Sequence, residues 1–117
     1  MGRLLSVLVV ALTAAAMVVM AQDHAMHEGG EGPATAGYAA ANAAMHEAMA
    51  IEYSGDPDVD FARAMIPHHQ GAIDMAEVVL ANGKDPDLRK LAEEIIAAQQ
   101  SEIAFLQQWL AAHGGSQ

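Results

Sequence analysis

Methionine and histidine occur together at three places in this sequence. The 117-residue chain contains eight Met, six His and no Cys. Thioether sulfur and imidazole nitrogen suit Cu(I), and by extension Ag(I), because the thioether is soft, uncharged and needs no deprotonation. The residue types therefore point to a copper site with these candidate metal ligands: Met45, His46 and Met49 in one group, Met65, His68, His69 and Met75 in a second, and His24, Met26 and His27 in a third.

Two of these groups have the spacing of an α-helix. Residues three, four or seven apart lie on one helix face. Met65, His68 and Met75 can therefore point toward one place. The same holds for Met45 and Met49. If the two helices cross at these levels, three or four ligands converge, which is enough for a Cu(I) site.

A purely structural explanation of the same residues stays open. Methionine at helical spacing more often fills gaps in a core than it binds a metal. His68 and His69 both lie on apolar stripes but cannot face one point, and leaving either without a partner would cost about 1–3 kcal/mol. They need a metal ion or a polar neighbour, and Gln99 and Glu102 are the candidate groups that would orient them around a metal. His113 is predicted to be a helix-end residue.

Composition and spacing exclude several other functions. Without Cys there is no disulfide, zinc knuckle, iron–sulfur cluster or thiol nucleophile. The formal net charge of −10 argues against nucleic acid as a partner and favours a cation. A di-iron site would need Glu-x-x-His pairs, and no Glu lies three residues before His46, His68 or His69. No Ser or Thr nucleophile accompanies the His pair and no glycine-rich phosphate loop occurs, so no enzymatic activity is expected.

The first 21 residues have the pattern of a signal peptide. Arg3 precedes an uncharged run from Leu4 to Ala21, and the short side chains near its end fit cleavage before Gln22. An uncleaved anchor is the alternative, since the run approaches the length that spans a bilayer. We expect a periplasmic or secreted protein with no membrane contact after cleavage.

The composition changes again on either side of residue 36. Residues 22–36 are rich in Gly, Glu, His and Pro and lack an apolar period, so they are predicted to be a disordered arm. This arm carries His24, Met26 and His27, which are the weaker metal candidates. A helical bundle domain is predicted over 37–113, followed by a short tail at 114–117.

Three helices are predicted, so the fold class is all-α. The first is Ala-rich and runs from about Thr35 to Tyr53. The second begins after the N-cap residue Asp56 and has a proline in its first turn, and the third has the same capping pattern after Asp85. The third helix ends near His113.

The tight connection at Gly83 and Lys84 predicts that the second and third helices form an antiparallel hairpin. Residues equally far from the turn should then lie side by side. Gln99, Glu102 and Ile103 are expected at the level of Met65 and the His pair.

The second helix has two adjacent apolar stripes and a polar back. This pattern predicts a helix packed in a bundle. The first stripe comprises Phe61, Met65, His68, Ala72, Met75 and Val79, the second comprises Ala62, Ile66, His69, Ile73, Ala76 and Leu80, and the polar back comprises Asp60, Arg63, Gln70, Asp74 and Glu77.

The run Met65-Ile66-Pro67-His68-His69-Gln70, within the segment 60–76, resembles the hallmark of a family of small secreted bacterial proteins called domain of unknown function 305. The likeness continues through the Lys84-Asp85-Pro86 turn to Leu110 and covers about half of the precursor. It implies a ferritin-like fold. Some members, the CopM-type periplasmic proteins, bind copper and silver and support copper resistance.

Residue by residue, the resemblance implies that Met65, His68, His69 and Met75 belong to the metal site. The segment Met45-His46-x-x-Met49 also looks like the part that precedes the domain in these relatives. Only one copy of the helical hairpin is present, so a complete four-helix bundle would need a partner chain. We therefore expect a homodimer.

The expected function is that of an exported protein that binds Cu(I), and by extension silver, for sequestration or transfer in copper homeostasis or resistance. The alternative is a metal-independent helical interaction module in which the His pair is merely buried. No nucleic-acid partner is expected in either case.

Overall fold

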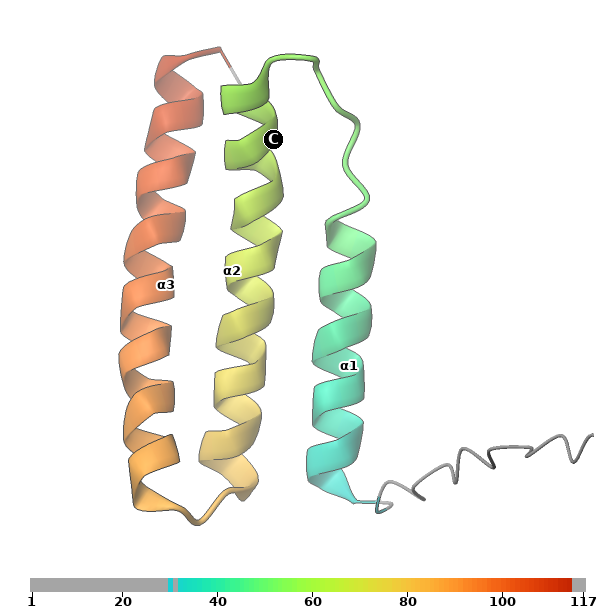
Figure 1. The fold of residues 1–117 in the computed structure, drawn as a ribbon, viewed down its shortest axis with the longest axis vertical. Helices are drawn as coiled ribbons and strands as arrows, with labels where there is room; N and C mark the ends of the chain where they lie inside the picture. Colours follow the sequence, from blue (N-terminus) through green and yellow to red (C-terminus); the bar gives the residue numbers. More distant parts are fainter. Residues whose placement is uncertain (1–29, 31, 115–117) are drawn as a thin grey trace, which may run out of the picture.

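The computed structural model describes residue 30 and residues 32–114, which form three α-helices and no strand (Figure 1). Helix α1 spans Pro33–Ala48, α2 spans Pro57–Asn82 and α3 spans Pro86–Ala112. The prediction of an all-α helical bundle is confirmed for these residues. The expected signal peptide and the arm residues His24, Met26 and His27 lie outside them. None of the described helices is both long and apolar enough to cross a membrane.

Helices α2 and α3 begin where the repeated Asp-Pro capping pattern predicts. The Asp56 carboxylate accepts hydrogen bonds from the backbone N–H groups of Asp58 and Val59. The Asp85 carboxylate accepts one from the N–H of Leu88. Each cap satisfies backbone donors that have no partner within the helix, and the proline that follows has no N–H to satisfy.

Helix α1 differs from its predicted limits at both ends. It begins at Pro33, inside the segment predicted to be a disordered arm, because proline suits the first helical position and the alanines that follow favour helix. It ends at Ala48 rather than near Tyr53. The connecting segment 49–56 then runs extended alongside the helices to reach the start of the longer α2 (Figure 1).

Asp60, in the first turn of α2, fastens this connecting segment. Its carboxylate accepts hydrogen bonds from the N–H and Oγ–H of Ser54, both at 2.8 Å, and from the N–H of Gly55 at 3.0 Å. Gly55 has a φ of +90°, a conformation that glycine adopts without strain. The hydrogen bonds from Ser54, above all from its backbone, lower the pKa of Asp60.

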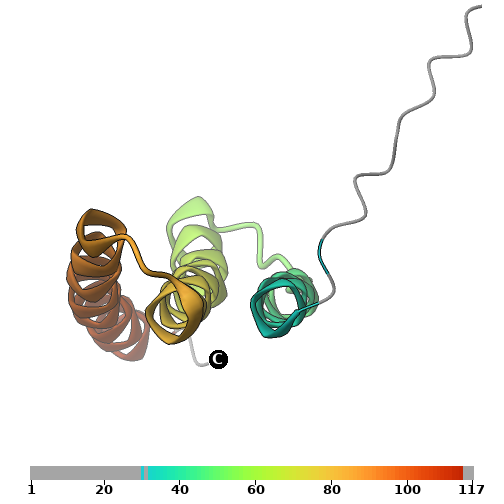
Figure 2. The same cartoon turned by 90° about the horizontal axis from the view of Figure 1, so that it is seen from below.

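The three helices lie side by side, with α2 in the middle (Figure 2). Helices α2 and α3 form the predicted antiparallel hairpin and share a core made of Ala62, Ile66, Leu106 and Leu110. Helices α1 and α3 do not touch within the described part of the chain. The second apolar stripe of α2 therefore faces α3, whereas its polar back and its first apolar stripe lie on the two open faces of the layer.

Candidate functional site

His69 lies between α2 and α3 and is held by a carboxylate from the neighbouring helix. Its side chain is 14% exposed, and its Nε2 lies 2.5 Å from Oε2 of Glu102. The antiparallel pairing of the hairpin places these two residues at the same level. The structure thus brings together one of the two histidines and one of the two groups expected to orient the pair.

The other ring nitrogen of His69 is left without a partner. Nδ1 is buried and makes no hydrogen bond, and the same is true of Oε1 of Gln99. With Nε2 donating its proton to Glu102, the neutral ring has its lone pair on Nδ1. Histidines that bind metals commonly have one ring nitrogen fixed by a carboxylate, and His69 shares this feature.

His68 points elsewhere. It is exposed, and its ring meets that of His69 edge to face, with the ring centres 6.0 Å apart and the planes inclined by 60°. The expectation that the two rings cannot face one point agrees with this geometry. His68 could bind an ion at the surface of α2 without any change of the hairpin.

The two α2 methionines lie on the same side of the helix as the His pair. Met65 is half-buried and packs against the core shared with α3, whereas Met75 is 44% exposed. At 100° per residue, Met65, both histidines and Met75 fall within an arc of about 120°. Ala72, which has a small side chain, lies near the middle of this arc.

From α1, one methionine approaches this arc. The Met45 side chain packs directly on Gly71, so closely that a Cβ at position 71 would clash with its sulfur. His68 and Met75 lie one turn to either side of Gly71 on α2. Met45 thus belongs to the contact between α1 and the part of α2 that carries these two candidates.

The other two α1 candidates are less close. Met49 is the half-buried C-cap residue of α1, one turn beyond Met45. His46 is exposed and lies five residues after the buried Ala41, so it points away from α2. The structure does not bring His46 to the remaining candidates.

Harder ligands are not clustered in the described part of the chain. No three His, Asp or Glu side chains there are grouped so that they could hold a metal ion.

His113 takes no part in this arrangement. It is the C-cap of α3, and its ring stacks on that of Trp109 with the centres 4.1 Å apart. Its Nδ1 lies 2.7 Å from the backbone oxygen of Trp109. The prediction of a helix-end residue is confirmed.

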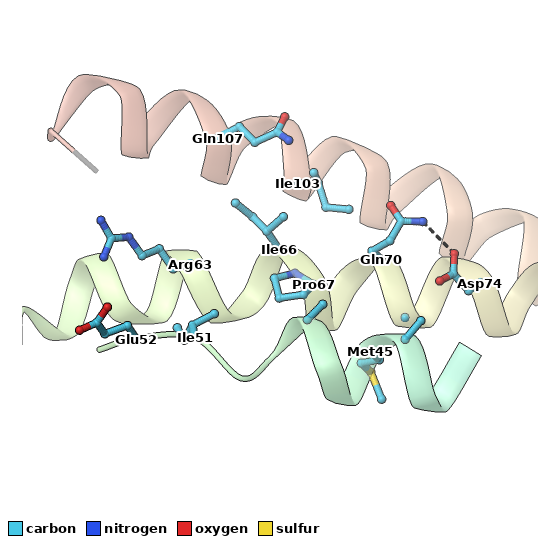
Figure 3. Close-up of a pocket in the computed structure, with 13 residues that line it drawn as sticks. Met45, Ile51, Glu52, Arg63, Ile66, Pro67, Gln70, Asp74, Ile103 and Gln107 are labelled. Carbon is cyan, nitrogen blue, oxygen red and sulfur yellow. Dashed lines mark hydrogen bonds between the residues drawn. The ribbon is translucent and has the colours of Figure 1, made fainter. Parts of the chain in front are cut away.

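A groove that the sequence reading missed runs over α2 between α1 and α3 (Figure 3). Its volume is about 750 Å³, and Arg63 and Glu52 lie at one end, with Met45 toward the other. Gln70 donates a hydrogen bond to Asp74 along its floor. Arg63, Gln70 and Asp74 belong to the polar back, and the position of the two flanking helices makes that stripe concave.

The opposite face of the layer is apolar. Residues two apart on a helix point about 200° away from each other. Arg63, Gln70 and Gln107 line the groove, so Phe61, His68 and Phe105 point to the other side. We call this side the apolar face and define it by the following residues: Phe61, Met65, His68, Ala72, Met75 and Val79 on α2, and Leu88, Leu91, Ile95, Ala98, Glu102, Phe105 and Trp109 on α3.

Comparison with known proteins gives a family but no activity. The family profile described as "Domain of unknown function (DUF305)" matches residues 58–117, just over half of the chain. A relative named "Uncharacterized protein L153", from Acanthamoeba polyphaga mimivirus, is 44% identical over 46 residues, which are 39% of this chain and 30% of the relative. The chain thus matches less than a third of that relative's length. The match over α2 and α3 makes this chain a member of the DUF305 family.

Proposed function

We propose that this protein binds Cu(I), and by extension Ag(I), through imidazole and thioether groups on α2. The observation that carries the proposal is His69, whose Nε2 is held by Glu102 while its buried Nδ1 has no hydrogen-bond partner. A buried polar atom without a partner costs about 1–3 kcal/mol. A metal ion bound at Nδ1 would remove that cost.

The thioethers on the same side of α2 support the choice of a soft ion. Met65 and Met75 lie in the arc of the His pair, and Met45 reaches that part of α2 from the neighbouring helix. Met49, His46 and the arm residues His24, Met26 and His27 remain candidates for further ligands. The net charge of −10 favours attraction of cations.

The proposed role is binding rather than catalysis. Thioether and neutral imidazole ligands resist loss to disulfide formation in an oxidising compartment, which suits the proposed export to the periplasm or outside the cell. Sequestration or hand-over of copper, as in the CopM-type proteins, follows as the proposed function.

The test is an anaerobic Cu(I) titration against a competing chelator. We expect His68→Gln combined with His69→Gln to weaken binding about 100-fold or more, and Glu102→Gln alone by about 10–100-fold, because Glu102 fixes the ligand. His113→Gln is the matched control, since His113 lies at the end of α3 and should change nothing. Unchanged affinity in the double variant would contradict the proposal.

One observation favours a second candidate function. Phe61 and Phe105, both on the apolar face, are 61% and 65% exposed. Large exposed apolar surfaces mark interaction sites. A metal-independent interaction module would leave the purified protein folded and without affinity for Cu(I), Ag(I) or Zn(II).

A further inference from the structure

The apolar face carries side chains that nothing in the described structure covers. Besides Phe61 and Phe105, the exposed large side chains on it include Met75, Leu88 and Leu91. Phe61 and Met75 lie fourteen residues apart, as do Leu91 and Phe105, which is about four helical turns in each case. The exposed apolar groups therefore form a continuous strip along both helices of the hairpin.

The size of this face matches what a stable protein interface requires. Helices α2 and α3 contain 26 and 27 residues. At about 1.5 Å per residue and about 10 Å per helix, the hairpin presents a face of about 800 Å². A standard stable interface buries about 800 Å² from each partner.

The charge distribution restricts where two copies can meet. The chain has a net charge of −10, so two copies repel each other over most of their surfaces. The central part of the apolar face is the exception, because its Glu102 is already hydrogen-bonded to His69. Asp58, Asp87 and Glu94 point to the same side but lie at the ends and outer edge of the hairpin. A second copy that packs on this central part leaves these acidic side chains at the rim of the interface, in water.

We propose that a second copy of the chain packs on the apolar face, so that two α2–α3 hairpins form a four-helix bundle. Antiparallel hairpins of this kind bury their open stripe against each other in bundles. The first apolar stripe of α2 then packs on the second copy, as the second apolar stripe packs on α3 within each chain. His68 lies near the middle of α2 and is covered by the second copy.

Sedimentation velocity on the chain from Gln22 onward, which retains every described residue, tests this proposal. A chelator is present throughout, so the outcome does not depend on copper binding. We expect a dimer for the parent chain, and Phe105→Glu should raise the dimer dissociation constant about 30–100-fold. The matched control is Tyr53→Glu, because Tyr53 is 72% exposed but lies in the connecting segment, away from the apolar face.

Trp109 provides a second readout. It is the single tryptophan of the chain and lies on the apolar face. Its fluorescence emission should shift to shorter wavelength as the protein concentration rises, in the parent chain and in Tyr53→Glu but not in Phe105→Glu. Helical circular dichroism shows that each variant is folded.

Two results would overturn the proposal. One is a parent chain that stays monomeric at about 100 μM, a concentration that populates weak dimers. If deletion of residues 22–31 then made the monomer bind an apolar dye, the occupant of the face would be the arm. The other is a Phe105→Glu variant that is folded and dimerises as well as the parent.

Discussion

At the residue scale, packing rather than residue type separates the candidate ligands. His68 and His69 are neighbours in sequence, yet one is exposed and the other is hydrogen-bonded to Glu102 between two helices. Met45 packs on Gly71, a contact that only glycine permits. The ligand candidates are thus held by two different helix contacts, α2 with α3 and α2 with α1.

The contact between Met45 and Gly71 predicts that substitutions at the two positions have non-additive effects on stability. Gly71→Ala adds a Cβ where the Met45 sulfur lies, and such overpacking costs about 1–3 kcal/mol. Alanine favours helix over glycine by about 1 kcal/mol. We expect Gly71→Ala to destabilise the parent chain and to cost less in a Met45→Ala background, which removes the sulfur and Cγ contacts but keeps the Cβ of residue 45 at 2.9 Å, as measured by chemical denaturation of the four chains. Additive effects would show that the two residues are not in contact.

At the scale of the elements, the short α1 is positioned through a loop fastened to α2. The carboxylate of Asp60 accepts hydrogen bonds from Ser54 and Gly55, near the end of the extended segment 49–56. These hydrogen bonds fix the segment to the start of α2. Along the helix itself, Gly37 packs against Val78 and Gly71 against Met45. The position of α1 therefore depends on two glycine contacts and one carboxylate rather than on a wide apolar face.

The loop contact predicts a local response to acid. The pKa of Asp60 is lowered in the folded protein, chiefly by the backbone hydrogen bond from Ser54. A lowered pKa means that this contact stabilises the fold fully above the usual carboxyl pKa of about 4 and is lost as the pH falls through the lowered value. NMR titration should show the Ser54 and Gly55 amide signals moving only below about pH 4.

Asp60→Asn should shift the same two amide signals already at neutral pH. Asp58→Asn is the matched control, because the Asp58 side chain lies in the same helical turn and is exposed. Amide signals of Ser54 and Gly55 that are unaffected by Asp60→Asn would contradict the contact.

At the scale of the whole molecule, three helices in one layer leave two faces open. One is the mixed polar groove over α2, and the other is the apolar face, which carries His68 but not His69. The core is thin, with Leu110 as its only large fully buried side chain among the described residues. A bound ion or a second copy would therefore add a large share of the stability.

The copper proposal predicts that a soft ion stabilises the whole domain. A ligand at about 100 times its dissociation constant adds about 2.7 kcal/mol to the free energy of unfolding. For a domain of this size, that corresponds to a rise in Tm of about 10–20 °C. We expect Ag(I) to give such a rise at pH 7 in scanning calorimetry, and a chelator to reverse it.

The same rise should shrink below about pH 6, because imidazole must be unprotonated to bind. A Tm that Ag(I) leaves unchanged at pH 7 would contradict ion binding by the folded protein. A rise that is equal at pH 5 and pH 7 would exclude the histidines and leave only thioether ligands.

The sequence by itself determined the helices, the hairpin and the family, because caps, apolar periods and a tight turn act within a few residues along the chain. Asp56 and Asp85 cap the helices as predicted, and counting from the turn placed Glu102 near the His pair. The early end of α1 was not predictable, because it depends on where the connecting segment must meet Asp60.

Only the tertiary structure decided which apolar stripe of α2 is covered and which histidine is held. The two stripes look alike in sequence, and only the position of α3 buries one and leaves the other open. Side-chain direction likewise decided that His69 hydrogen-bonds to Glu102 and that Met45 packs on Gly71. The two helices that flank α2 make its polar back part of a groove. These features arise between helices, where the contacts join residues far apart in sequence and local patterns carry no information about distance or orientation.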